Sequence, residues 1–91
     1  MPLTPTTDHA LPVPGTELTD LYCVAALATA GLNVARIERR HGRAVFTLAP
    51  DDRLSRTVQD YYRGALLLPA RSYADAIRGL KAAIHAPALA Q

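Results

Sequence analysis

The pattern of apolar and polar positions predicts a helix, a β-hairpin and two further helices, in that order. Thr16 is the expected N-cap of the first helix, with Thr19 as the alternative, and Gly31 is expected just beyond its C-terminal end. No charged residue occurs between Leu21 and Leu32, and both faces of this helix are apolar. A helix that is apolar all round is buried all round, so either other elements of the chain or a second subunit must cover it.

Residues 34 to 40 and 43 to 49 are predicted to form two strands joined by a tight turn at His41-Gly42, where glycine tolerates a positive φ. A two-residue loop places apolar positions opposite apolar positions, which supports this register. The predicted pairs are Arg40 with Arg43, Arg39 with Ala44, Ile37 with Phe46 and Ala35 with Leu48. The predicted polar face carries Arg36, Glu38, Arg40, Arg43, Val45 and Thr47.

A second, amphipathic helix is predicted after the hairpin. Asp51 or Asp52 is expected to cap it, and Gly64 is expected to end it. Its apolar stripe consists of Leu54, Val58 and Tyr61. The residues that follow, Leu66-Leu67-Leu68, are too few for a helix and predict a short third strand or a buried extended link.

The third predicted helix begins at a sequence that resembles a capping box, Ser72 to Asp75, and extends toward Pro87. The order of elements predicts one α+β domain over residues 16 to 86, with the helices packed on one face of a small antiparallel sheet. Four prolines in residues 1 to 15 predict a disordered or extended arm, and residues 87 to 91 are expected to be a frayed tail.

The distribution of charge says more than the net charge of +2. Three acids and no Arg or Lys precede Arg36, whereas ten Arg and Lys residues and five acids occur from Arg36 onward. Such asymmetry suits an anionic partner. The alternative is coding bias in a GC-rich genome, because nearly all the cations are Arg and the chain is rich in Ala.

The end of the predicted hairpin is the main candidate site. Within eight residues it carries the cationic or titratable side chains of Arg36, Arg39, Arg40, His41 and Arg43. A two-stranded ribbon can enter a nucleic-acid groove, and Arg can bind guanine or phosphate. The alternative is a solvated hairpin whose charges prevent edge-to-edge aggregation.

A second basic stripe is predicted on the helix after the hairpin, at Arg53, Arg56 and Arg63. It is either an ordinary polar helix face or, if it lies beside the hairpin, part of one continuous basic surface. Tyr62 points away from the apolar stripe and could stack on an unpaired base, whereas Tyr61 is in step with the core positions.

No catalytic, metal or cofactor signature is present in the sequence, and the prediction is a protein that is not an enzyme and holds no metal or cofactor. Cys23 is the only cysteine, so no intramolecular disulfide can form. His9, His41 and His85 fall on different elements. No apolar run approaches the length of a membrane span, and no signal peptide is recognisable, so a cytoplasmic location without membrane contact is expected.

Several short motifs occur in a familiar order along the chain. They are Asp20-Leu21-Tyr22, Gly31-Leu32, the strand from Arg43 to Leu48, Asp60-Tyr61-Tyr62-Arg63-Gly64, and Leu80-Lys81. The layout, over residues 17 to 85, resembles a family of short phage and bacterial proteins classed as a domain of unknown function. The resemblance implies a common fold and a link to phage or mobile DNA, and it transfers no catalytic residue.

The sequence therefore predicts a small nucleic-acid-binding protein, acting as a homodimer, whose basic hairpin and second helix face the phosphates. The alternative is a protein–protein interaction module of the phage or mobile-element accessory type, without nucleic-acid binding. In that case the apolar first helix or an open sheet edge would contact a host or replication protein.

Overall fold

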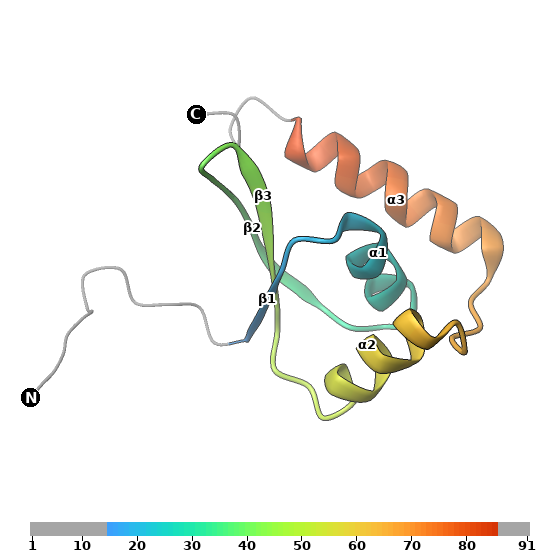
Figure 1. Cartoon of the computed structure of the whole chain (residues 1–91). Helices are drawn as coiled ribbons and strands as arrows, with labels where there is room; N and C mark the ends of the chain where they lie inside the picture. The colour runs from blue at the N-terminus through green and yellow to red at the C-terminus, as the bar shows by residue number, and fades with distance from the viewer. Residues whose placement is uncertain (1–14, 86–91) are drawn as a thin grey trace, which may run out of the picture.

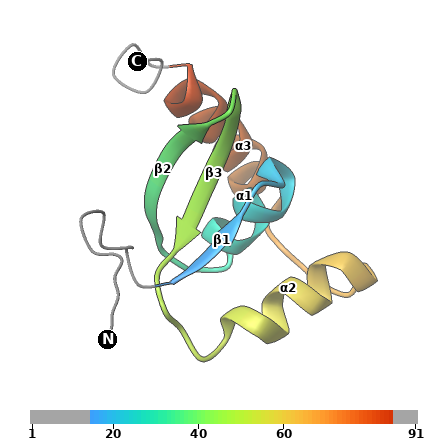
Figure 2. The same ribbon diagram turned by 60° about the vertical axis from the view of Figure 1, so that its left-hand side comes forward.

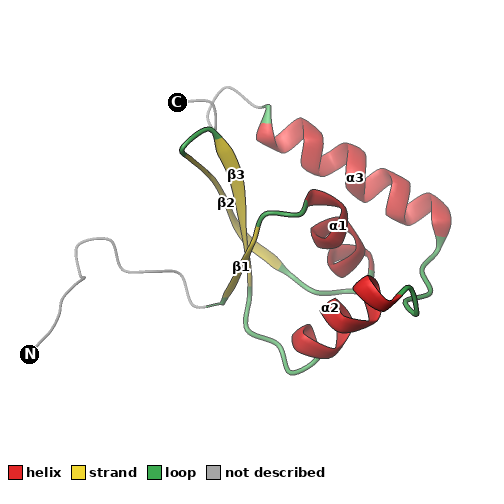
Figure 3. Ribbon diagram, viewed as in Figure 1, coloured by secondary structure: helices red, strands yellow, loops and turns green. Residues whose placement is uncertain are grey.

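The structure, a computed structural model, describes residues 15 to 85, which form a three-stranded antiparallel sheet and three helices (Figures 1 and 3). The elements are β1 (Thr16–Leu18), α1 (Leu21–Thr29), β2 (Val34–Arg40), β3 (Arg43–Leu48), α2 (Leu54–Arg63) and α3 (Ala70–Ile84). The predicted α+β class, with helices against one face of the sheet, is confirmed (Figure 2). The predicted frayed tail and, apart from Gly15, the predicted arm lie outside the described residues.

The first strand, β1, replaces what the sequence predicted to be the start of a helix. It pairs antiparallel with β3, with Thr16 opposite Leu48, so the strand order is β1-β3-β2. Gly15, which precedes β1, has φ 142°, and a Cβ there would lie 2.0 Å from the carbonyl oxygen of Leu48. Only glycine lets the chain approach β3 this closely, which explains why residues 16 to 18 join the sheet.

The N-cap of helix α1 is Asp20, four residues later than the expected Thr16. The Asp20 Oδ1 atom accepts the backbone N–H groups of Tyr22, at 3.0 Å, and Cys23, at 3.2 Å. Neither Thr16 nor Thr19 is the cap, so both predicted caps are wrong. The predicted glycine at the C-terminal end is confirmed: Gly31 has φ 99° and directly follows the C-cap.

Helix α1 is the centre of the core. All five residues from Cys23 to Leu27 are fully buried. The sheet contributes Phe46 and Leu48 to the same cluster, and α2 and α3 pack on the remaining sides (Figures 1 and 2). Elements of the same chain therefore cover Cys23 to Leu27, and these five residues offer no surface to a second subunit.

The hairpin has the predicted turn and nearly the predicted register. His41 and Gly42 both have positive φ, 52° and 78°, as a two-residue hairpin turn requires. The pairs nearest the turn are as predicted, Arg40 with Arg43 among them. The pairing of Ala35 with Leu48 is wrong, because an irregularity between Val34 and Arg36 places Val34 opposite Leu48 and leaves Ala35 exposed.

Helix α2 packs on the core through the predicted stripe of Leu54, Val58 and Tyr61 and ends at Gly64, which has φ 76°. Its N-cap residue is Arg53, so neither predicted aspartate is the N-cap. Asp51 still contributes near this end, because its Oδ1 accepts the Arg53 backbone N–H at 2.8 Å.

The segment between α2 and α3 forms no strand, so the strand alternative is wrong and β1 is the third strand of the sheet. The segment is a link, as the other alternative predicted, but it is not fully buried, because Leu66 and Leu68 are half-buried and Leu67 is 92% exposed. Helix α3 begins at Ala70 rather than at Ser72. Pro69 precedes it with φ −61°, already suited to a helix start, and its carbonyl accepts the Tyr73 N–H at 3.0 Å.

Candidate nucleic-acid interface

The outward face of the hairpin is dominated by Arg40, which bridges the two edge strands. Its Nη1 and Nη2 donate to the two carboxylate oxygens of Glu17 at 2.9 and 2.6 Å, and Nη2 also donates to Glu38 at 3.0 Å. Glu17 lies on β1 and Arg40 on β2, so the bidentate pair crosses the central strand β3. The hydrogen bonds lower the pKa of both carboxyl groups and raise the pKa of Arg40.

Arg36 adds to this network, with its Nε 3.5 Å from Glu38. Val45 and Thr47 point to the same face by register, yet they are only 7% and 2% exposed. Both lie on the central strand, flanked on either side by the long side chains of the network. Arg36 and Arg40 are therefore engaged within the protein, which makes these two residues poor candidates for phosphate contacts.

Arg39 points to the opposite side and joins the hairpin to α3. Its Nη2 donates to the carbonyl oxygen of Ile84 at 2.7 Å, and its Nη1 donates to that of Gly42 at 3.5 Å. Ile84 is the last residue of α3, where carbonyl groups lack helical partners and a positive charge is favourable. This contact holds the hairpin turn beside the C-terminal end of α3.

The hairpin turn itself presents His41 and Arg43, both exposed. Neither forms an ion pair with any residue between 15 and 85. Together with Arg40 and Val45 they line a shallow hollow of about 340 Å³. The sequence predicted both residues as site residues, and the structure leaves their side chains accessible.

The second basic stripe, on α2, is paired with acids close in sequence. The Arg53 Nη2 lies 2.9 Å from Asp51, the Arg56 Nε lies 4.0 Å from Asp60, and Arg63 forms a close ion pair with the same Asp60. The hydrogen bonds from Arg53 lower the pKa of Asp51 to about 2.

Helix α2 also lies at the end of the sheet opposite the hairpin turn (Figure 1). Strand β3 runs away from the turn before the chain enters α2, which explains this separation. The two basic groups therefore do not form one continuous surface, and the interpretation of α2 as an ordinary polar helix face gains support.

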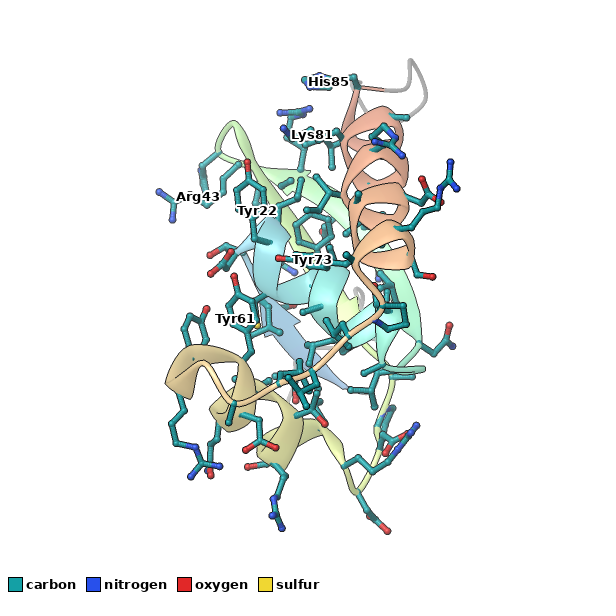
Figure 4. The ribbon with its side chains drawn as sticks, turned by 90° about the vertical axis from the view of Figure 1, so that its right-hand side faces the viewer. Tyr22, Arg43, Tyr61, Tyr73, Lys81 and His85 are labelled. Carbon is teal, nitrogen blue, oxygen red and sulfur yellow. The ribbon has the colours of Figure 1, made fainter. Side chains whose placement is uncertain are left out.

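The C-terminal end of α3 adds two groups that the sequence analysis did not assign to a site, Lys81 and His85 (Figure 4). The Lys81 ammonium lies 5.7 Å from the centroid of the Tyr22 ring, within cation–π range. Tyr22 is 49% exposed, whereas the five residues that follow it in α1 are fully buried. Lys81 and Tyr22 are far apart in sequence, so only the packing of α3 on α1 reveals the pair.

Tyr62 is a surface residue, as predicted, with 62% of its area exposed. Its hydroxyl donates to Asp20 Oδ2 at 2.8 Å, and this bond raises the pKa of Tyr62. Its ring meets Tyr61 edge to face, with centroids 5.0 Å apart. Tyr61 packs against the core as expected, and its burial raises its pKa to about 12.

Searches found no protein-family model, no curated protein and no solved structure that matches the chain. The resemblance to a family of phage and bacterial proteins therefore stays a prediction. Within residues 15 to 85, no three His, Cys, Asp or Glu side chains gather as a metal site would require. The helices of the same segment are all too short or too polar to cross a membrane.

Proposed function

We propose that the protein binds nucleic acid through the surface where the hairpin turn meets the C-terminal end of α3. We call this the turn–helix surface, and it consists of Arg39, His41, Arg43, Lys81 and His85. The decisive observation is the location of cations that have no acid partner. Four such Arg and Lys residues occur between residues 15 and 85, and all but Arg71 lie on the turn–helix surface.

Unpaired cations are the groups that can bind phosphate without first breaking an internal ion pair. Arg43 and Lys81 would each neutralise a phosphate and release a condensed counterion, which makes binding strongly salt-dependent. Arg39 is held by carbonyl oxygens rather than carboxylates, so its positive charge still adds to the local potential.

The test is fluorescence anisotropy of the full chain with labelled single-stranded and duplex DNA and RNA at several salt concentrations. We expect binding at low salt. The logarithm of the association constant should fall linearly with the logarithm of the salt concentration. If no probe binds at low salt, the proposal that this protein binds nucleic acid is wrong.

The homodimer belongs to the same proposal, with the edge of β2 as the contact in place of α1. Strand β2 has seven residues and pairs only with β3 among the described elements. An unpaired strand edge is a template for pairing with another chain. Two copies joined there would present two turn–helix surfaces to one nucleic acid. Sedimentation equilibrium at micromolar concentrations should detect the dimer, and a monomer throughout that range would contradict it.

A second candidate function, a protein–protein interaction module, is favoured by one observation on the opposite side of α1. Leu67 is 92% exposed on the link between α2 and α3. Beside it is a hollow of about 370 Å³ that is lined by Ala26, Tyr61, Gly64, Leu66, Leu68, Ala70 and Tyr73. A partner of the phage or mobile-element type would place an apolar side chain there. Copurification from a nuclease-treated lysate should then be lost with Leu67→Asp and kept with Arg43→Ser.

A further inference from the structure

We infer that the nucleic acid at the turn–helix surface is single-stranded, and that an unpaired base stacks on Tyr22 while Lys81 and Arg43 contact the adjoining phosphates. This inference rests on the proposed function and adds the class of nucleic acid. The juxtaposition that carries it is an exposed aromatic ring directly beside Lys81, one of the unpaired cations (Figure 4). Arg43 lies at the hairpin turn on the outward face of the sheet.

The ring of Tyr22 projects from a backbone that is fixed on both sides. Its N–H donates to Asp20 Oδ1 at 3.0 Å, and its carbonyl oxygen accepts the Tyr73 hydroxyl at 3.1 Å. The next five residues of α1 are fully buried, yet Tyr22 itself is 49% exposed. A preorganised ring of this kind loses little conformational entropy when a base stacks on it.

A second exposed ring, that of Tyr62, is joined to the start of α1 through Asp20. The carboxylate of Asp20 accepts the Tyr22 N–H through one oxygen and the Tyr62 hydroxyl, at 2.8 Å, through the other. The first bond comes from the Tyr22 backbone and the second from the Tyr62 side chain, so Asp20 joins the start of α1 to α2, and Tyr62 is 62% exposed. An exposed ring of this kind offers a second place where a base can stack, which is how strands without sequence preference are commonly held.

The charge of Asp20 does not exclude phosphates from this place. Its two oxygens already accept hydrogen bonds from Tyr22, Cys23 and Tyr62, and it caps the positive end of α1. The Lys81 ammonium lies over the Tyr22 ring, 5.7 Å from its centroid. A base on Tyr22 therefore has a cation beside it for its own phosphate.

A duplex fits this surface poorly. Its bases are stacked on one another and cannot reach a tyrosine ring, so only its backbone would be in contact. The other arginines that could extend a backbone contact, on the outward face and on α2, are engaged with acids. A short unpaired strand uses both rings and cations, and it is the ligand that this small surface accommodates.

The experiment compares three probes of the same length, about ten nucleotides, which is within the range that one small domain covers. They are fluorescein-labelled oligo(dT), an abasic strand with the same phosphates, and a duplex. Wild-type protein should bind oligo(dT) about 10-fold more tightly than the abasic strand, as expected for loss of base stacking. Equal affinity for these two strands would overturn the stacking inference while leaving the proposed function intact.

The variants are Tyr22→Leu and, as the matched control, Tyr22→Phe. Leu should lower the affinity for oligo(dT) about 10-fold without changing the salt slope, whereas Phe keeps the ring and should bind as the wild type does. Wild-type affinity in Tyr22→Leu would overturn the inference. Absence of binding by any probe at low salt would overturn both the inference and the proposed function.

A measurement on the unmodified chain covers the case in which Tyr22→Leu fails to fold. The sequence has four Tyr and no Trp, so its intrinsic emission comes from tyrosine. Stacking of oligo(dT) on Tyr22 and Tyr62 should quench part of that emission, and the abasic strand should not. Equal quenching by the two strands, or none by either while anisotropy shows binding, would overturn the inference.

Discussion

The hairpin end and helix α2 carry similar numbers of arginines, yet the acids around them differ. On α2, Arg56 and Arg63 share Asp60, which is close in sequence, and Arg53 is paired with Asp51. At the hairpin, Glu17 and Glu38 pair only with the outward arginines and leave the turn without an acid. The placement of acids, more than the number of arginines, therefore defines an anion-binding surface.

The difference between the two regions is tested most directly by removing the same charge from each of them. Replacing Arg43 and Lys81 together by Ser should weaken nucleic-acid binding strongly and reduce the salt slope by about two, one for each lost phosphate contact. Replacing Arg56 and Arg63 by Ser removes an equal charge from α2 and should leave affinity and slope close to those of the wild type. Anisotropy titrations at several salt concentrations measure both quantities.

Equal losses in the two double variants would show that the net charge of the protein, and not the turn–helix surface, determines binding. All four side chains are exposed, so the melting temperatures of both variants should stay near the wild-type value. Circular dichroism before each titration checks this.

Arg40→Ser tests whether an arginine of the hairpin stabilises the fold or contacts nucleic acid. The change removes the bidentate bridge to Glu17 and the bond to Glu38, and leaves two carboxylates facing each other over β3. We expect the melting temperature to fall by a few degrees and the affinity for nucleic acid to change little. Arg43→Ser is the matched control, and it should show the reverse: unchanged melting and weaker binding. A large loss of affinity in Arg40→Ser at unchanged stability would place Arg40 in the interface.

Acid should weaken the fold through the same ion pairs. Arginine hydrogen bonds lower the pKa of Glu17, of Glu38 and, to about 2, of Asp51. A carboxyl group with a lowered folded-state pKa stabilises the fold at any pH above its unfolded-state value, and that contribution is lost as the pH falls through the folded-state value. Stability should therefore fall between about pH 4 and pH 2.

The two regions can be separated in that titration. Asp51→Asn should flatten the lowest part of the stability curve, whereas Arg40→Ser should flatten the part due to Glu17 and Glu38. The measurement is the urea midpoint as a function of pH. The groups are exposed, so added salt should reduce both effects. A wild-type curve that is flat down to pH 2 would contradict the assignment.

Local signals in the sequence were enough for the hairpin turn, its register near the turn and the glycines that end two helices. Each depends on residues close together in the chain, such as His41-Gly42 or Gly64. The apolar stripe of α2 was likewise predictable, because helical periodicity alone defines it. The polar helix face of α2 follows from the spacing of Arg56, Asp60 and Arg63.

The features that the sequence did not predict depend on residues that are far apart in the chain. Strand β1 has only three residues and exists because Gly15 allows the chain to approach β3. The bridge from Arg40 to Glu17, the bond from Arg39 to Ile84 and the approach of Lys81 to Tyr22 each join different elements. These contacts decide which cations remain available, so the candidate site could be predicted only as far as its hairpin turn.

The smallest effect is expected for Tyr62→Phe. This variant tests whether a residue of α2 contributes to nucleic-acid binding at the turn–helix surface. The variant removes the hydroxyl that donates to Asp20 and keeps the ring. Because the bond is exposed and Asp20 retains two backbone donors, the loss of stability should be small, about 0.5 kcal/mol. Affinity for oligo(dT) should be unchanged if the ring alone contributes. Tyr62→Ser, which removes the ring as well, should lower affinity by a smaller factor than Tyr22→Leu, because Tyr62 belongs to α2, whereas Lys81 lies over the ring of Tyr22. If Tyr62→Phe weakens binding as much as Tyr62→Ser does, the hydroxyl and not the ring contacts the ligand. Helix α2 would then contribute a hydrogen bond instead of a stacking platform to the surface formed by the hairpin turn and α3.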